Sequence, residues 1–253
     1  MRDDIQFPEL SISPQGVVHV YKTNYVIKLC RNQNMAQREM NFLAAAGPCA
    51  VDVLGPVQVP YGGGGFLMPL LATIDPNAIP LEEKLRLFGQ MHPLLSELHD
   101  MGIVHGDIKL SNMLVDGHGQ LKLCDFGSSV WIAENYAPPH ALSIRWCSPY
   151  RVGIGRASPL GFEDDIYAIG WAVWELFTGR PPYHDVADED VEAAILSGYS
   201  ADLGLVENKD ARAYIEECWR VYSVGVQNFN RSVSWRVCRA GTVRGGSSNE
   251  TLF

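Results

Sequence analysis

The sequence HGDIKLSN at residues 105–112, followed by CDFG at residues 124–127, decides how the rest of this chain is interpreted. Asp107 and Asn112 lie five positions apart, which suits a loop that presents a carboxylate to a hydroxyl group and an amide to a metal ion. Asp125 would supply the second metal ligand. The two motifs together predict a centre for phosphoryl transfer.

A short hairpin is predicted between these two motifs. Apolar residues at 114–115 and 121–123 flank the sequence DGHG at 116–119, which is typical of two strands joined by a glycine-rich turn. Such a hairpin would fix Asn112 and Asp125 relative to each other.

Both motifs resemble the catalytic and metal-binding loops of eukaryotic protein kinases, His-Arg-Asp-x-x-x-x-Asn and Asp-Phe-Gly. A single Asp here would be an ordinary turn residue. The presence of both motifs, in this order and with a hairpin between them, is a specific signal for the kinase resemblance. The resemblance implies that Asp107 accepts or orients the proton of a substrate hydroxyl and that Lys109 stabilises charge on the phosphoryl group. It further implies that Asn112 and Asp125 hold Mg²⁺.

The N-terminal part is predicted to form a hairpin, from residues 17–21 and 25–29. Lys28 ends a run that is similar to the Val-Ala-Ile-Lys strand of the family, whose lysine contacts the α- and β-phosphates of ATP. By itself, a lysine at a strand end is ordinarily a solvated residue. A helix is expected from Asn34 to Ala46, and Glu39 within it is the candidate partner of Lys28.

The glycine-rich loop departs from the family pattern. Aligned on Gly-x-Gly-x-x-Gly-x-Val, residues 11–18 read SISPQGVV, so only Gly16 and Val18 remain as nucleotide-binding candidates. A serine Cβ limits the approach of the backbone, and Pro14 has no amide hydrogen. The phosphate clamp is therefore expected to be weaker or differently shaped.

Two strands, 51–59 and 66–71, are expected next, with Met68 to Leu70 as the hinge against whose backbone adenine would lie. A helical period runs from Leu81 to Met101, interrupted by Pro93, which could kink the helix. His92 and His99 are seven apart on one face of it and are interpreted as ordinary helix residues, without a third ligand for a metal.

Further motifs extend the resemblance to residues 103–183. Residues 142–150 align with Gly-Thr-x-x-Tyr-x-Ala-Pro-Glu, which places Ser143 against Asp107 and Lys109. Asp165 would cap the backbone of the catalytic loop, or simply favour a helix N-terminus. Gly106 replaces the arginine that pairs with a phosphorylated loop in most kinases, so we expect an enzyme that is not activated in this way.

The end of the chain departs from the family. Tyr150 replaces a glutamate that pairs with a downstream arginine, and after Cys218-Trp219 the expected Asp-Pro and Arg-Pro are absent, so both halves of that ion pair are missing. Residues 220–253 are predicted to be an atypical tail, disordered or poorly packed. This tail has five Arg and one Glu, whereas the whole chain has a net charge of -9.

Composition excludes several classes of protein. The net charge of -9 argues against general binding to nucleic acid or to an anionic membrane, and the six cysteines form no Cys-x-x-Cys pair. No signal peptide or long apolar span is evident. We therefore expect reduced thiols and a cytoplasmic location, with the nucleus not excluded.

The sequence thus predicts an α+β, two-lobed fold over residues 10–219, with a small β-rich lobe at about 10–70 and a larger helical lobe at about 71–219. The expected reaction is transfer of the γ-phosphoryl group of ATP, with Mg²⁺, to Ser or Thr of a protein substrate. One alternative is a pseudokinase that binds nucleotide or acts as a scaffold. The other is a small-molecule phosphotransferase, because His-Gly-Asp with a later Asn also occurs there, although Lys109 favours a protein kinase. The sequence does not indicate the substrate or the oligomeric state.

Overall fold

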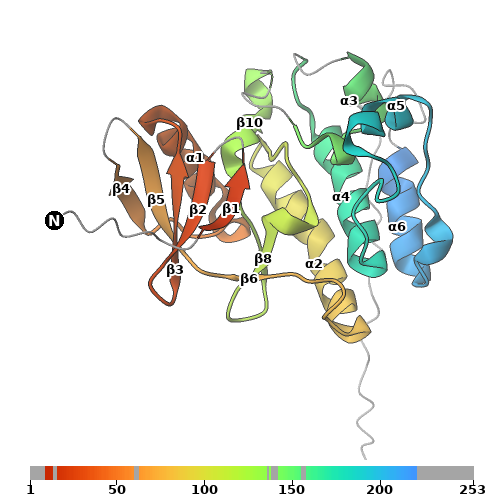
Figure 1. Ribbon diagram of the computed structural model, residues 1–253, viewed down its shortest axis with the longest axis horizontal. Helices are drawn as coiled ribbons and strands as arrows, with labels where there is room; N and C mark the ends of the chain where they lie inside the picture. Colours follow the sequence, from red (N-terminus) through yellow and green to blue (C-terminus); the bar gives the residue numbers. More distant parts are fainter. Residues whose placement is uncertain are drawn as a thin grey trace, which may run out of the picture.

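The computed structural model describes residues 9–13, 16–59, 63–135, 137, 142–154 and 158–220. A β-rich N-terminal half and a mainly helical C-terminal half lie side by side (Figure 1). The predicted two-lobed α+β fold is confirmed. Within the described ranges, no helix combines the length and the apolar character needed to cross a bilayer.

The N-terminal half is a five-stranded sheet with one helix packed against it. Antiparallel pairing gives the strand order β1-β2-β3-β5-β4. The predicted hairpin is formed by β2 and β3, and the side chain of Asn32 caps the predicted helix by accepting a bond from the Met35 amide at 2.9 Å. The elements are β1 (Glu9–Ser13), β2 (Gly16–Tyr21), β3 (Tyr25–Cys30), α1 (Gln33–Ala46), β4 (Gly55–Gln58) and β5 (Gly64–Pro69).

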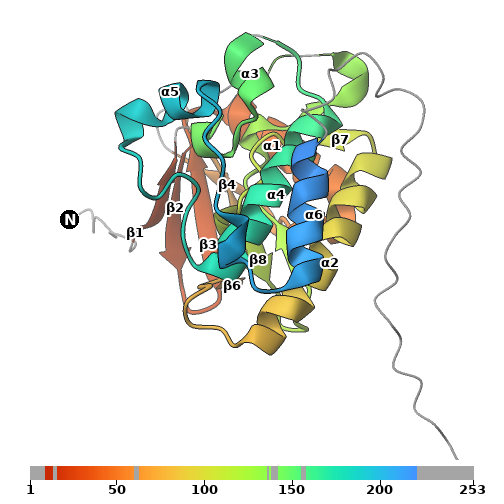
Figure 2. The same ribbon diagram turned by 90° about the vertical axis from the view of Figure 1, so that its right-hand side faces the viewer.

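The C-terminal half is organised around α4 (Phe162–Thr178), which lies between α2 (Leu81–Asp100) and α6 (Lys209–Arg220) in Figure 1, and Figure 2 shows the three helices running beside one another. Its two tryptophans, Trp171 and Trp174, are almost completely buried and form the centre of the core. The remaining elements are β6 (Ala72–Thr73), β7 (Ile103–Val104), β8 (Met113–Val115), β9 (Leu121–Leu123), β10 (Val130–Trp131), α3 (Pro149–Ile154) and α5 (Val191–Leu196).

Two predicted strands have different bounds in the structure. Of the strand expected over residues 51–59, only β4 is present. The amide of Val51 instead donates to the carbonyl of Leu123 at 2.9 Å, and this bond joins the two halves of the molecule. The strand expected over 66–71 begins two residues earlier, at Gly64. A Cβ there would lie 2.6 Å from the Cα of Gln33, so this glycine lets α1 pack close to the sheet.

The predicted long helix is confirmed as α2, which continues through Pro93 and ends at Asp100. Of the predicted tail, Arg220 is the last residue of α6, and residues 221–253 lie outside the described residues. Pro14 and Gln15, in the segment that aligns with the glycine-rich loop, also lie outside the described residues.

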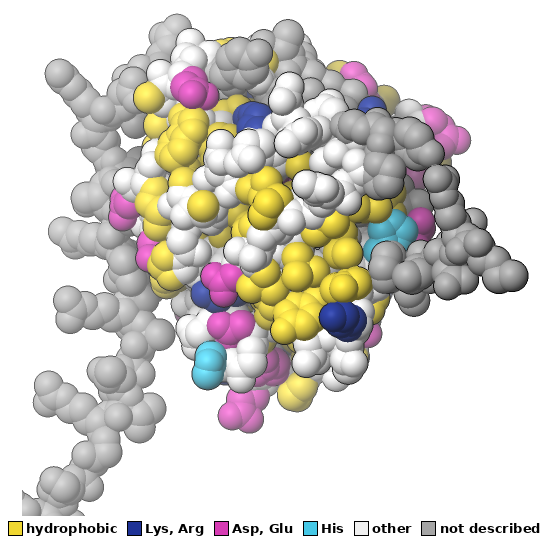
Figure 3. Space-filling view, turned by 90° about the vertical axis from the view of Figure 1, so that its left-hand side faces the viewer, with side chains coloured by type: hydrophobic (Ala, Val, Ile, Leu, Met, Phe, Trp, Pro, Cys, Tyr) yellow, Lys and Arg dark blue, Asp and Glu magenta, His cyan; other side chains and the backbone are white. Residues whose placement is uncertain are grey.

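Apolar side chains gather on the outer side of the N-terminal half (Figure 3). Exposed apolar side chains are common on folded proteins, so we assign this surface no binding role. The exposed large apolar residues of this half include Leu10, Tyr25, Leu54 and Leu70.

Candidate active site

The predicted hairpin between the two motifs is formed by β8 and β9, with Met113 opposite Leu123. The amide of Cys124 donates to the carbonyl of Asn112 at 3.0 Å, which extends the contact beyond the last strand pair. Asp125 follows directly, with a left-handed backbone (φ 62°) that is uncommon for a residue with a side chain. The hairpin therefore brings the two proposed metal-binding residues to the same end of one element.

Asp107 is held in place through one carboxylate oxygen only. Its Oδ2 accepts bonds from Nζ of Lys109 at 2.7 Å and from Nδ2 of Asn112 at 2.9 Å. Its Oδ1 is buried and has no hydrogen-bond partner among the described residues. A buried carboxylate oxygen without a partner is costly, so this oxygen is suited to accept a bond from a bound hydroxyl group.

Lys28 joins Glu39 and Asp125 in a buried cluster. Its Nζ lies 2.6 Å from Oε1 of Glu39 and 2.6 Å from Oδ1 of Asp125. Burial disfavours the charged lysine, but the two carboxylates outweigh it and raise the pKa of Lys28. Burial would also raise the pKa of Asp125, yet Lys28 and Lys109 keep that pKa below its ordinary value. Asp125 is therefore ionised and available as a ligand at neutral pH.

The other candidate nucleotide-binding residues lie largely on one face of the sheet. Val18 pairs directly with Lys28, and Gly16 pairs with Cys30, two positions along the same strand. Met68 of β5 pairs with Val26 and is buried on that face. Leu70 lies just beyond β5, is exposed, and donates its amide to the carbonyl of Asn24 at 2.8 Å.

Asp165 holds the backbone of the catalytic loop, as predicted. Its Oδ2 accepts from the amide of His105 at 2.7 Å, and its Oδ1 accepts from the amide of Gly106 at 2.8 Å. His99 was interpreted as an ordinary helix residue, but its Nε2 lies 3.0 Å from Oδ2 of Asp165. The last turn of α2 therefore also supports the carboxylate that positions the loop. Among the described residues, no group of three or more His, Cys, Asp or Glu side chains is arranged to hold a metal ion.

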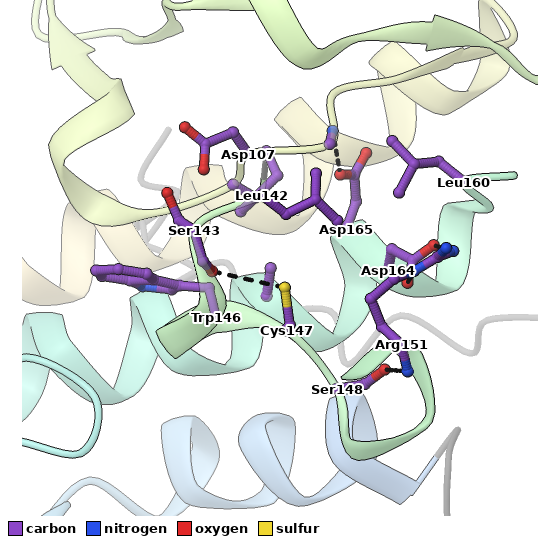
Figure 4. Close-up of a pocket in the computed structure, with 13 residues that line it drawn as sticks. Asp107, Leu142, Ser143, Trp146, Cys147, Ser148, Arg151, Leu160, Asp164 and Asp165 are labelled. Carbon is purple, nitrogen blue, oxygen red and sulfur yellow. Dashed lines mark hydrogen bonds and ion pairs between the residues drawn. The ribbon is translucent and has the colours of Figure 1, made fainter. Parts of the chain in front are cut away.

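Ser143 reaches the site through Lys109. Nζ of Lys109 donates to Oγ of Ser143 at 2.9 Å and also to Asp107, so the lysine bridges the two residues. The predicted contact of Ser143 with Lys109 is present, whereas no direct bond joins Ser143 to Asp107. A pocket beside Asp107 lies between the catalytic loop and the segment that carries Ser143 (Figure 4). Its lining includes Leu142, Ser143, Trp146, Cys147, Arg151 and Leu160.

Arg38 links α1 to the segment that follows Asp125. Its guanidinium donates to the carbonyl of Gly127 at 3.2 Å and to the carbonyl of Ser129, and it lies over the ring of Phe42. The sequence analysis did not predict this contact of Arg38. The contact fixes the helix that carries Glu39 against the loop that carries Asp125.

Gly106 has a backbone conformation and surroundings that exclude the arginine found in most kinases. Its φ is 77°, and a Cβ would lie 2.8 Å from Cδ1 of Leu160 and 2.9 Å from the carbonyl oxygen of Ser128. A side chain would therefore require both neighbours to move. This position offers no cation to a phosphorylated loop.

We expect Arg38→Met to raise the KM for ATP about tenfold, because the variant loses two charged hydrogen bonds while keeping an apolar side chain over Phe42. The measurement is initial-rate kinetics with varied Mg·ATP. Arg31→Met, at an exposed position just before α1, serves as the control. Equal KM values for the two variants would show that Arg38 does not support the nucleotide site.

The residues present fit a Mg²⁺–nucleotide pair. Mg²⁺ is commonly bound through one or two protein oxygen ligands, with water and phosphate completing its shell, so a site with only Asp125 and Asn112 is adequate. The amide nitrogen of Asn112 donates to Asp107, which leaves its oxygen to face a cation. Lys28, fixed by two carboxylates, provides a positive charge for phosphate oxygens.

Glu175 of α4 lies behind this site and has a perturbed pKa. Its Oε2 is buried without a hydrogen-bond partner in the described part of the chain. Burial raises its pKa from 4.5 to about 7, although Lys109 and the nearby indole of Trp146 oppose the change. The folded state therefore holds a proton that the unfolded chain releases at lower pH.

Glu175→Gln should consequently remove a loss of stability at high pH. In the parent protein, the free energy of unfolding should fall as pH rises from about 4.5 to about 7 and stay low above that. At pH 8 the variant should be more stable by about 2 to 3 kcal/mol, with little difference near pH 4.5. Urea unfolding across this pH range measures the effect; parallel curves for both proteins would contradict it.

The fold and the site together define a two-lobed domain of the protein kinase type, and comparison with known proteins agrees. The protein kinase domain family matches residues 59–222, so the chain belongs to the protein kinase family. Relatives include mitogen-activated protein kinase kinase kinase 3 of Arabidopsis thaliana, 35% identical over 127 residues, which are 50% of this chain and 23% of the relative.

Two further relatives are also similar to about half of the chain. Mitogen-activated protein kinase kinase 10 of Arabidopsis thaliana is 33% identical over 137 residues, 50% of this chain and 45% of the relative. Serine/threonine-protein kinase PSK2 of Saccharomyces cerevisiae is 31% identical over 140 residues, 55% of this chain and 12% of the relative. The chain thus spans less than half the length of each of these three relatives.

Proposed function

We propose that this chain transfers the γ-phosphoryl group of ATP to serine or threonine hydroxyls of protein substrates. The observation that supports this most strongly is Asp107, which is fixed through Oδ2 while its buried Oδ1 has no partner among the described residues. A structural carboxylate would be expected to use both oxygens. The relatives named as serine/threonine or mitogen-activated kinases support the same class of acceptor.

In this proposal, Oδ1 of Asp107 accepts a bond from the acceptor hydroxyl and orients it. Asp107 takes the hydroxyl proton as the hydroxyl oxygen bonds to the γ-phosphorus, and the bond from that phosphorus to the β,γ-bridging oxygen breaks, so that ADP leaves. Lys109 lies 2.7 Å from Oδ2, where its charge would stabilise the phosphoryl oxygens. Lys28 would hold the α- and β-phosphates. Mg²⁺, when bound by Asn112 and Asp125, would neutralise charge on the phosphates. Positioning and charge therefore account for most of the expected rate enhancement.

The second candidate is a pseudokinase, which the incomplete glycine-rich loop favours. Only Gly16 and Val18 of that pattern remain, and Gly16 is packed so that an added Cβ would lie 2.1 Å from the carbonyl oxygen of Leu29. The pairing of β2 with β3 thus requires glycine at position 16, whether or not nucleotide binds. The intact Lys28, Asp107, Asn112 and Asp125 favour the enzyme.

Transfer of radiolabel from γ-labelled ATP to a degenerate serine/threonine peptide library tests the proposal. We expect Mg²⁺-dependent labelling of serine or threonine, detected by phosphoamino acid analysis, and none with Lys28→Met. Labelling of choline or an aminoglycoside instead of peptide would favour a small-molecule phosphotransferase. Binding of Mg·ATP without labelling of any acceptor would favour the pseudokinase.

A further inference from the structure

The segment of residues 142–151, here called the acceptor loop, forms one wall of the pocket beside Asp107 (Figure 4). It begins at the residue before Ser143 and ends on the first turn of α3. A loop of this kind must keep one shape if it is to hold a peptide against Asp107. In this chain, two arginines near opposite ends of the loop, Arg145 and Arg151, join it to the rest of the large lobe.

Arg145 binds the start of the loop to the segment after α4. Its Nη1 donates to the carbonyls of Pro182 at 2.9 Å and Tyr183 at 2.7 Å. Its Nη2 donates to the carbonyl of Val186 at 3.1 Å and forms an ion pair with Asp188. The Asp188 side chain is 90% exposed, so solvent weakens this pair and the three carbonyl bonds are the main restraint.

Arg151 binds the end of the loop to the start of α4. Its Nε and Nη2 contact the two carboxylate oxygens of Asp164 at 3.0 and 2.5 Å. The same guanidinium donates to the carbonyls of Ser158 at 2.9 Å and Pro159 at 2.7 Å. The side chains of Arg151 and Asp164 are only 4% and 8% exposed, so removing either charge would leave the opposite charge buried without its counter-ion.

The first turn of α4 therefore holds both parts of the site through consecutive carboxylates. Asp164 binds the acceptor loop through Arg151, and Asp165 binds the amides of His105 and Gly106 in the catalytic loop. Since α4 is one continuous helix whose core face is buried, these contacts hold the two loops in one relative position. The distance between acceptor and catalytic carboxylate is thereby set by one helix.

The usual means of holding this loop are absent from the sequence. Gly106 provides no side chain for a phosphorylated residue, and Tyr150 stands where a glutamate would pair with a downstream arginine. However, Arg151 and Asp164 form another buried ion pair one residue beyond Tyr150.

We propose that Arg145 and Arg151 are positioning residues that hold the acceptor loop in its peptide-binding shape without any modification of the chain. This rests on the proposed kinase function and extends it to the peptide side of the site. Neither arginine touches Asp107, Lys28 or Asp125 in the described contacts. Their loss should therefore affect the acceptor more than the nucleotide.

Arg151→Met and Arg145→Met test the proposal by kinetics. We expect each variant to raise the KM for a peptide from the serine/threonine library at least about tenfold, while the Kd for Mg·ATP changes less than about twofold. Arg220→Met is the matched control, because Arg220 forms an exposed ion pair with Glu217 at the end of α6. Parallel changes in the peptide KM and the nucleotide Kd, or no change in either, would overturn the proposal.

Amide hydrogen exchange provides a readout that does not depend on activity. In either variant, protection of the amides of residues 144–154 should fall at least about tenfold, and protection in α1 should be unchanged. Arg151→Met removes a buried charge and could unfold the protein. In that case Arg145→Met gives the result, because the side chain of Arg145 is partly exposed. Exchange in the acceptor loop equal to that of the Arg220→Met control would contradict the proposal. Absence of turnover in the parent protein with the expected exchange pattern would instead reject only the proposed function.

Discussion

Asp107→Asn should abolish phosphoryl transfer, with kcat lower by at least about a thousandfold. The asparagine has nearly the same shape, so it can fill the space and still accept one bond. It has no negative charge with which to accept the proton of the hydroxyl at Oδ1 or to attract Lys109, whose Nζ lies 2.7 Å from Oδ2. In the nucleotide site, Asn112 would lose its bond to this carboxylate but keep the bond to the main-chain carbonyl of Asp107 at 2.8 Å, and Lys28 and Asp125 do not contact Asp107 in the described hydrogen bonds.

Initial rates with the peptide library and the Kd for Mg·ATP would be measured together. The Kd for Mg·ATP should remain within about threefold of the parent value, because only the acceptor side loses its charge. Asp100→Asn, at an exposed position at the end of α2, controls for loss of a carboxylate elsewhere. A variant with the parent kcat would show that Asp107 does not take part in the reaction.

Asp125→Asn should have the second largest effect, on the metal. Its carboxylate is ionised and lies 2.6 Å from Nζ of Lys28, so the substitution removes both a metal ligand and one of the two charges that fix the lysine. We expect the apparent affinity for Mg²⁺ in the transfer reaction to fall by about a hundredfold or more. The backbone at this residue has positive φ, which asparagine tolerates well.

Titration of the transfer rate with Mg²⁺ at fixed ATP measures this effect. Asp52→Asn, at an exposed position, is the control and should give the parent curve. If Asp125→Asn also gave the parent curve, the metal would have to be held by other groups.

Parts of the site could be predicted from the sequence because they depend on local spacing. The hairpin of β8 and β9 follows from strand residues around a glycine turn, and it places Asn112 and Asp125 together. Lys28 and Glu39 were matched through the resemblance to the kinase family. Their ion pair at 2.6 Å agrees with that prediction.

The arginines that organise the site could not be predicted in the same way. Arg38 and Arg145 bind mainly to backbone carbonyls, and Arg151 binds two carbonyls besides the carboxylate of Asp164. Every residue has a backbone carbonyl, so such partners leave no signature in the sequence. The contact of His99 with Asp165 joins two helices 66 positions apart and depends on how α2 packs against α4. Only the tertiary packing determines these contacts.

The strand bounds in the N-terminal half were also affected by packing. Gly64 and Gly65 have low strand preference and were interpreted as part of a loop. In the structure both belong to β5. A Cβ at Gly64 would lie too close to α1, and a Cβ at Gly65 would lie too close to the carbonyl of Lys28. The glycines are therefore needed for the contact between helix and sheet rather than for a turn.

The central claim is that Lys28, Asn112 and Asp125 converge on a Mg²⁺–ATP complex beside Asp107. Isothermal titration of the parent chain with ATP, with and without Mg²⁺, tests it most directly. The account predicts binding that tightens at least about tenfold when Mg²⁺ is present and that loses this dependence in Asp125→Asn. Absence of ATP binding, or binding of equal strength with and without Mg²⁺, would contradict it.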